Sequence, residues 1–258
     1  MIPRILIVAG SDCSGGAGLQ ADSRTVQALG GYAMTAVTAV TVQNTLGVSD
    51  VITIPPGVVA AQMRACIGDI GADAVKLGML GCAGVVAAVA EVLHGVRMPV
   101  VLDPVMVAKG GAVLLDDDAV GALRALIPWA AVVTPNTPEL AALTGVVIED
   151  EADALLAAQE LLGLGARAVL AKGAHLDGDT IVDWLVTPDG NQRFASPRIA
   201  TRHTHGTGCT LASALAVGLA RGTDLVTATS QAREYVRAAI KAAPKFGLGH
   251  GPLGVPRA

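Results

Sequence analysis

The stretch ILIVAGSDCSGGAGLQADSRTVQALGG, residues 5–31, contains the pattern that decides the fold. It starts with a short apolar run that stops at Gly10, which is typical of a buried strand. Small residues follow, and a helical spacing then extends from Leu19 to Leu29 and closes at Gly30-Gly31. This stretch therefore predicts one strand–loop–helix unit of an α/β protein.

The same alternation continues along the chain. Short apolar runs followed by helical spacing predict further buried strands at residues 36–42, 74–77, 100–103, 131–134 and 168–172. Parallel strands joined by crossover helices account for this order.

The segment near Pro188-Asp189-Gly190 has a different pattern. Extended runs flank it, from Thr180 to Val186 and from Arg193 onward, and Asp-Gly between extended runs favours a hairpin. No internal repeat and no Pro- or Ser-rich linker divides the chain. We predict a single domain over residues 1–258, a doubly wound α/β sheet with an antiparallel edge.

Composition and charge exclude several classes of function. The net charge of −4 gives no basic field for a nucleic acid, and two Trp, two Tyr and two Phe offer little stacking surface. Apolar runs are too short to serve as a signal peptide or to cross a membrane, so we expect a cytoplasmic protein without a membrane partner. The four cysteines lack CxxC spacing, so reduced thiols are expected in place of disulfides or structural zinc.

The stretch Thr204-His205-Gly206-Thr207-Gly208-Cys209-Thr210 precedes a helical pattern at Leu211 to Ala220. Gly206, Thr207 and Gly208 could turn their N–H groups toward an anion, and the positive end of the helix would assist them. That helix end could also lower the pKa of the Cys209 thiol, which would then accept a proton from a hydroxyl group. The alternatives are an ordinary glycine turn and a buried structural cysteine.

Charged and amide side chains end or follow three of the predicted strands. Lys172 could pair with phosphate oxygens, and Asp103 lies where open α/β sheets place their ligands. Asn136 and Glu139 are three residues apart and could both face a magnesium ion, although the same pair is typical of a helix capping box. A solvated lysine and a surface aspartate are the alternatives for Lys172 and Asp103.

The loop from Gly10 to Gly18 has neither the Gly-Lys-Ser/Thr ending of a Walker A motif nor a dinucleotide fingerprint. Its glycines allow close approach to a small planar ligand, with Asp22 one turn into the helix as acceptor for a hydroxyl group. Gln43 offers a carbonyl and an amino group side by side, which suits the edge of an aminated ring. An exposed helix charge and a surface glutamine are the alternatives for Asp22 and Gln43.

Six separated blocks together resemble the hydroxymethylpyrimidine/phosphomethylpyrimidine kinases. They occur in the family's order over nearly the whole chain, namely AGSDCSGGAGLQAD at residues 9–22, VQNT at 42–45, KLGM at 76–79, LDPVM at 102–106, TPNxPE at 134–139 and THGTGCT at 204–210.

This resemblance implies a ribokinase-like α/β/α sandwich that uses ATP and Mg²⁺ to phosphorylate 4-amino-5-hydroxymethyl-2-methylpyrimidine and then its monophosphate, for thiamine biosynthesis. It also implies a homodimer. By resemblance, Gln43 would pair with the ring, Asp22 would bind the hydroxymethyl group, and residues 107–112 would form a flap over the site. The implied pocket walls are Gly10, Ala17, Met79 and Val105.

The remaining roles follow from the same resemblance. Cys209 resembles the catalytic base, Gly206, Thr207 and Gly208 resemble an anion hole, and Lys172 resembles a residue that steadies the phosphates. The implied magnesium site consists of Asn136, Glu139 and Asp103.

Three other functions stay open at this point. A pyridoxine or pyridoxal kinase would use the same framework for a similar hydroxymethylated ring. A sugar kinase is disfavoured because that branch generally has aspartate where Cys209 stands. A non-catalytic binding module would not need Lys172, Glu139 and Cys209 together.

Overall fold

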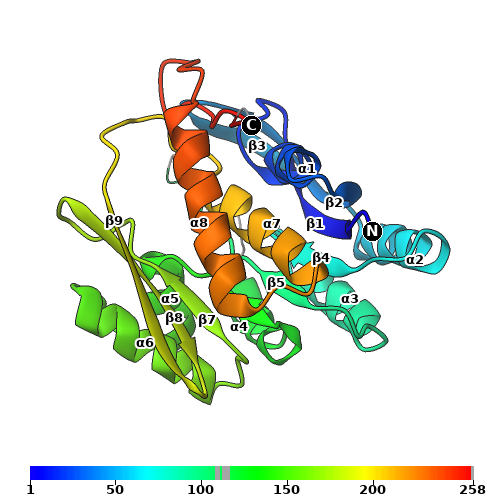
Figure 1. Cartoon of the computed structure of the whole chain (residues 1–258). Coiled ribbons are helices and arrows are strands. Elements are labelled where there is room, and N and C mark those ends of the chain that lie inside the picture. The colour runs from blue at the N-terminus through cyan, green and yellow to red at the C-terminus, as the bar shows by residue number, and fades with distance from the viewer. Residues whose placement is uncertain (108–110, 112–116, 257–258) are drawn as a thin grey trace.

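A computed structural model describes residues 1–107, 111 and 117–256. The described residues form a nine-stranded sheet in the order β3-β2-β1-β4-β5-β6-β7-β8-β9 (Figure 1). Its strands are β1 (Arg4–Asp12), β2 (Tyr32–Asn44), β3 (Gly47–Thr53), β4 (Ala74–Leu77), β5 (Val100–Leu102), β6 (Val132–Val133), β7 (Val169–Lys172), β8 (Thr180–Thr187) and β9 (Gly190–Pro197).

Helices pack on both faces of the sheet; the first six lie between strands along the chain, and the last two follow β9. They are α1 (Gly18–Ala28), α2 (Pro56–Asp69), α3 (Ala83–Leu93), α4 (Asp117–Arg124), α5 (Thr137–Thr144), α6 (Glu151–Gly163), α7 (Thr207–Ala220) and α8 (Leu225–Lys241), with a short 3-10 helix at Ile127–Trp129.

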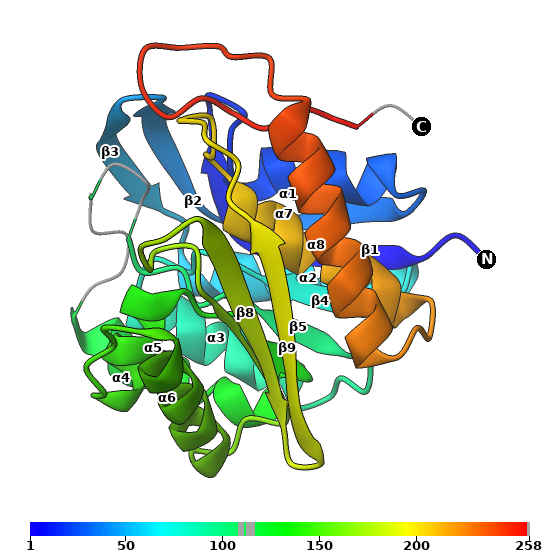
Figure 2. The same cartoon turned by 60° about the vertical axis from the view of Figure 1, so that its left-hand side comes forward.

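Alternation of side chains along the strands produces the two cores. In β1, Leu6 and Val8 pack with apolar residues of α2 to α6, whereas Ile5 and Ile7 face α1, α7 and α8 on the other side. Figures 1 and 2 show these helices on opposite faces of the sheet. The predicted α/β/α sandwich is confirmed.

The strands β1, β2, β4, β5, β6 and β7 pair in parallel. The predicted hairpin is confirmed, because β8 pairs antiparallel with β7 and with β9, and Thr187 lies opposite Gly190. The prediction that residues 36–42 lead directly into a helix was wrong, because β3 comes first and pairs antiparallel with β2. Its sequence GVSDVIT mixes small and polar residues on an exposed edge, so its apolar pattern is weak.

Parallel strands bring distant polar residues to one edge of the sheet, because their carboxyl ends point the same way. Asp12 ends β1 and Lys172 ends β7, while Asp103 and Thr134 directly follow β5 and β6. The first turn of α7 reaches the same edge, where Gly208 lies beside both Lys172 and Asp103.

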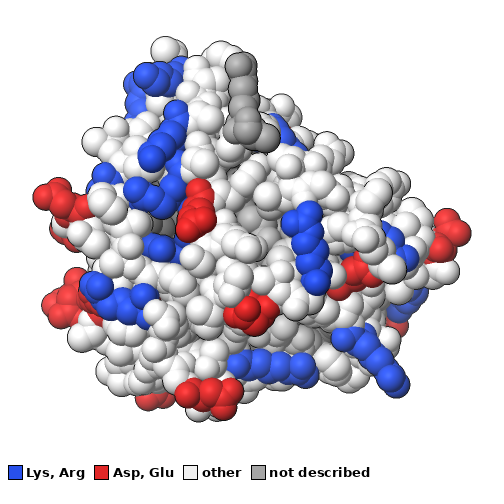
Figure 3. Space-filling model, in the orientation of Figure 1, with Lys and Arg blue, Asp and Glu red and all other residues white. Residues whose placement is uncertain are grey.

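The outer surface carries charges of both signs. On the face shown in Figure 3, acidic and basic side chains lie among many uncharged residues. Within the described ranges, every helix is too short or too polar to cross a bilayer.

Candidate active site

A cavity of about 670 Å³ opens at the carboxyl ends of the parallel strands, beside the start of α7. Gln43, Lys172 and Cys209 all line it, although they are far apart in the sequence. Val107 and Gly111 line it too, whereas the rest of the predicted flap, at 108–110 and 112, lies outside the described residues. The other predicted residues in its wall are Gly10, Ala17, Met79, Asp103, Val105, Asn136, Glu139, Gly206, Thr207 and Gly208.

The buried Asp12 side chain organises the loop after β1. Its carboxylate accepts hydrogen bonds from the Ser14 N–H (2.9 Å), the Ser14 hydroxyl (2.8 Å) and the N–H groups of Gly16 (3.1 Å) and Ala17 (2.8 Å). It also contacts His205 Nε2 at 2.9 Å. Burial raises the pKa of Asp12, but these hydrogen bonds outweigh burial, so its pKa lies below the ordinary value. An ionised Asp12 therefore joins the first loop to the loop before α7.

Gly206 fixes the start of α7. Its φ of 84° lies in the left-handed region, and a Cβ atom there would lie 2.1 Å from the Gly16 carbonyl oxygen. Gly206 gives α7 no side-chain cap, so the first-turn N–H groups, which include those of Gly208 and Cys209, form a site suited to an anion. The helix begins at Thr207, earlier than the predicted Leu211.

The pKa of the half-buried Cys209 thiol differs from the prediction. Burial raises its pKa to about 12, although Lys76 acts in the opposite direction. The prediction that the helix end lowers this pKa was wrong, because burial removes the thiolate from water and the nearby carboxylates of Asp22 and Asp103 also disfavour it. At neutral pH the group is a thiol in the ligand-free protein.

Lys76 and Asp22 form a buried ion pair below the cavity. Lys76 Nζ donates to Asp22 Oδ2 at 2.8 Å, and the Ser213 hydroxyl donates to Asp22 Oδ1 at 2.7 Å. Lys76 lines the cavity, whereas Asp22 is fully buried and does not. Asp22 is thus placed to hold Lys76, which does not support its predicted contact with a hydroxymethyl group.

Lys172 lies between two buried carboxylates. Its Nζ donates to Asp103 Oδ1 at 2.8 Å and lies 3.9 Å from Glu139 Oε2, and the Thr134 hydroxyl also donates to Asp103. Burial alone would raise the pKa of Asp103, but Lys172 and Lys76 outweigh burial and hold it below its ordinary value. Glu139 lies farther from Lys172, and burial raises its pKa to about 7.

Asn136 and Glu139 form the capping box of α5. Asn136 Oδ1 accepts from the Glu139 N–H at 2.9 Å, and Glu139 Oε2 accepts from the Asn136 N–H at 2.8 Å. Within the described ranges, no group of three or more His, Cys, Asp and Glu side chains is placed to hold a metal ion. The oxygen atoms of Asp103, Asn136 and Glu139 suit Mg²⁺, which would need phosphate oxygens and water to complete its coordination.

Gln43 also lines the cavity, near the end of β2. Its amide contacts the Thr41 hydroxyl at 3.2 Å and His205 Nε2 at 3.2 Å. The half-buried amide lines the cavity, so it can pair with the polar edge of a planar ring.

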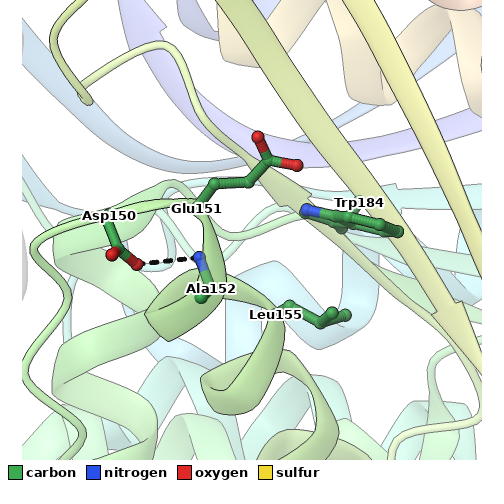
Figure 4. A pocket seen from close by; sticks show the side chains of 5 residues that line it. All are labelled: Asp150, Glu151, Ala152, Leu155 and Trp184. Atoms are coloured by element: carbon green, nitrogen blue, oxygen red, sulfur yellow. Dashed lines mark hydrogen bonds between the residues drawn. The ribbon is translucent and has the colours of Figure 1, made fainter.

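A second, smaller hollow lies between the start of α6 and β8 (Figure 4). Its carboxylates already have structural partners: Asp150 caps α6 through the Ala152 and Asp153 N–H groups, and Glu151 pairs with Arg193 at 2.6 Å. The larger cavity is therefore the candidate active site.

A family model described as phosphomethylpyrimidine kinase matches residues 12–254. The chain belongs to this family. It is 49% identical to a hydroxymethylpyrimidine/phosphomethylpyrimidine kinase of Streptomyces coelicolor, over 97% of this chain and 93% of that protein. It is also 51% identical to the thiamine biosynthesis bifunctional protein of Geobacter sulfurreducens, over 96% of this chain. That relative is longer, and the chain spans only about half (51%) of its length.

Solved structures agree with this assignment. Phosphomethylpyrimidine kinase from Clostridium difficile has a TM-score of 0.82 and 38% identity, with 93% of this chain and 100% of that chain covered. The ADP complex of Bacillus subtilis pyridoxal kinase has a TM-score of 0.91 and 33% identity, with 99% of this chain and 98% of that chain covered. Members of this family and pyridoxal kinases thus share the fold.

Sequence reasoning gave no role to three residues at the site: Asp12, Lys76 and His205. Asp12 precedes Ser14 and two glycines by two to four residues, which is a signal for a loop held by an aspartate side chain. Lys76 stands inside an apolar strand, where a charge needs a buried partner. These signals could have marked Asp12 and Lys76 as buried polar residues, but they do not identify His205 and Asp22 as their partners.

Proposed function

We propose that this protein transfers the γ-phosphoryl group of ATP to the hydroxymethyl oxygen of 4-amino-5-hydroxymethyl-2-methylpyrimidine, and then phosphorylates the monophosphate. The observation that carries the proposal is that Gln43, Lys172 and Cys209 line one cavity at the start of α7. The names of the relatives support the same substrate. Thiamine biosynthesis is the process that this reaction would serve.

Each part of the cavity suits one part of this reaction. Gln43 would pair with the aminated ring edge, and the first-turn N–H groups of α7 would hold the transferring phosphoryl group. The hydroxyl oxygen attacks phosphorus as the bond to the ADP oxygen breaks, while Lys172 offsets the negative charge on the phosphate oxygens. ADP and AMP-PCP complexes of Staphylococcus aureus pyridoxal kinase support a nucleotide in this fold.

Cys209 would accept the hydroxyl proton in the first step. Because its pKa is about 12 in the ligand-free protein, the thiol must first release its own proton to solvent before the thiolate can accept the hydroxyl proton, and Lys76 is the neighbour that favours the thiolate. The second acceptor is an ionised phosphate, which needs positioning more than deprotonation.

Asp103, Asn136 and Glu139 would face Mg²⁺ at the phosphate end of the cavity. The ion would neutralise charge on the phosphate oxygens when bound. Lys172 would keep Asp103 ionised for this purpose, because the two groups are in direct contact at 2.8 Å.

The direct test measures ADP formation and the phosphorylated product with four acceptors: the aminopyrimidine, its monophosphate, pyridoxine and ribose. We expect turnover with the first two and little with ribose. Turnover with pyridoxine alone would favour the second candidate, a pyridoxal kinase, to which the TM-score of 0.91 for the Bacillus subtilis enzyme gives specific support. ATP hydrolysis without acceptor phosphorylation would contradict both.

We also propose a cytoplasmic homodimer. Light scattering should then give a mass of about twice the 25.9 kDa of the chain. A mass equal to that of a single chain at assay concentration would contradict the dimer.

A further inference from the structure

The buried His205 ring connects the first loop to Gln43. His205 Nε2 lies 2.9 Å from Asp12 Oδ2 and 3.2 Å from the amide nitrogen of Gln43. The ring is fixed from two sides: its own backbone N–H donates to the Gly251 carbonyl oxygen at 3.1 Å, and a Cβ atom on Gly16 would lie 2.1 Å from ring carbon Cδ2. Because the ring cannot move freely, the hydrogen atoms available on Asp12, His205 and Gln43 limit which hydrogen bonds these three side chains can form.

Asp12 decides which atom carries the hydrogen in its contact with His205. The Asp12 carboxylate already accepts hydrogen bonds from Ser14, Gly16 and Ala17, which stabilise its ionised form. The ring nitrogen that faces Asp12 must therefore carry a hydrogen atom. This holds for the neutral tautomer protonated at Nε2 and for the imidazolium ion alike.

Two contacts of Gln43 then conflict if its amide nitrogen faces His205. The His205 N–H would face another N–H, which is a contact between two donors. The Thr41 hydroxyl has one hydrogen atom, but it would have to serve both the Ser11 carbonyl oxygen (3.0 Å) and the Gln43 carbonyl oxygen (3.2 Å). Two independent contacts are thus each mismatched.

A half-turn of the Gln43 amide removes both conflicts. The carbonyl oxygen Oε1 then accepts from His205 Nε2–H, which it shares with Asp12, and the amide nitrogen Nε2 donates to the Thr41 hydroxyl. Thr41 keeps its hydrogen for Ser11. One lone pair on Oε1 and one hydrogen on Nε2 stay available to a ligand in the cavity.

We propose that Asp12 and His205 are a positioning pair that holds the Gln43 amide with its oxygen on the His205 side, and thereby fixes which way round an aminopyrimidine lies. This inference rests on the proposed function. The free lone pair of Oε1 accepts from the 4-amino group, and the free hydrogen of Nε2 is donated to the adjacent ring nitrogen.

The orientation of the amide sets the position of the reacting group. The hydroxymethyl carbon is attached to the ring atom next to the one that bears the amino group, so it lies on the Oε1 side of Gln43. His205 directly precedes Gly206 and the start of α7, where the anion site and Cys209 lie. A reversed amide would favour a ring turned over, with its hydroxyl away from Cys209.

A double-mutant cycle tests the pair. We expect His205→Leu to lower kcat/KM for the aminopyrimidine ~10- to 100-fold, mainly through kcat because a turned-over ring binds without reacting, and to leave KM for ATP nearly unchanged. The same substitution in a Gln43→Ala background should cost less than about 3-fold, because its effect passes through Gln43. His205→Gln, which keeps an N–H donor, should recover most of the loss. Equal losses in both backgrounds would overturn the proposal.

A measurement without substrate separates this proposal from the proposed function. In the ligand-free protein, nuclear Overhauser effects should connect the Gln43 side-chain amide protons to the Thr41 methyl group and not to the His205 ring protons. The opposite pattern would overturn the amide orientation whatever the enzyme phosphorylates. The expected pattern in a protein that ignores the aminopyrimidine would leave the orientation standing and refute the substrate.

Discussion

At the scale of single residues, the cavity places a thiol, an ammonium group and two carboxylates in surroundings that change their chemistry. Burial opposes ionisation of Cys209 and Glu139, whereas Lys172 keeps Asp103 ionised at 2.8 Å. The two neighbouring carboxylates, Asp103 and Glu139, therefore have pKa values shifted in opposite directions. The first two predictions concern Cys209 and Glu139, the groups whose ionisation burial opposes.

The first prediction concerns the two phosphorylation steps. Cys209→Ala should lower kcat for phosphorylation of the hydroxymethyl group about 100-fold or more, because its proton acceptor is lost. Phosphorylation of the monophosphate should fall less than about 10-fold. Product analysis with each acceptor measures both steps, and Cys66→Ala, a half-buried thiol in α2, is the matched control. Equal losses in both steps would exclude the role of Cys209 as proton acceptor.

The second prediction concerns Glu139, whose pKa is raised from an ordinary 4.5 to about 7. Between these values the folded protein holds the Glu139 proton more tightly than the unfolded chain does. The contribution of Glu139 to the free energy of unfolding therefore falls as pH rises through this window. Glu139→Gln can still accept the Asn136 N–H but cannot ionise, so it lacks this fall.

Urea unfolding in the presence of EDTA, at several pH values from about 5 to about 8, measures this difference. The free energy of unfolding of Glu139→Gln should increase relative to that of the unsubstituted protein as pH rises. Parallel stability curves would show that Glu139 ionises at its ordinary pKa.

At the scale of elements, the start of α7 depends on two loops that interlock. Gly206 has a left-handed backbone, and its α-carbon leaves no space for a side chain beside the Gly16 carbonyl oxygen. Asp12 holds the partner loop through its hydrogen bonds to Gly16 and Ala17. The N–H groups at the start of α7 are therefore positioned by both loops.

The third prediction compares two glycines at opposite ends of α7. Gly206→Ala should lower the free energy of unfolding by about 3 kcal/mol and kcat by 10-fold or more, since backbone strain and a clash coincide there. Gly222 has a similar φ of 77° but open space around it, so Gly222→Ala should cost only about 1 kcal/mol and leave kcat unchanged. Denaturant unfolding and steady-state kinetics measure both. Equal effects of the two substitutions would contradict the interlock.

At the scale of the whole molecule, sequence patterns predicted most of the parallel strands because these are short, buried apolar runs such as Val100–Leu102. They missed β3, an exposed edge strand with a mixed sequence. They also brought Gln43, Lys172 and Cys209 to one site through the resemblance and the strand ends. Sequence patterns could not predict the contact between Asp12 and His205, because these residues are 193 positions apart.

We propose that one cavity combines ring recognition by Gln43 with phosphoryl transfer at the start of α7. The most direct test is kcat/KM for the aminopyrimidine in Gln43→Ala, with KM for ATP measured in the same experiment. We predict a loss of ~30-fold, equivalent to about 2 kcal/mol of hydrogen bonding, and an unchanged KM for ATP. An unchanged kcat/KM for the aminopyrimidine would show that Gln43 does not recognise the ring.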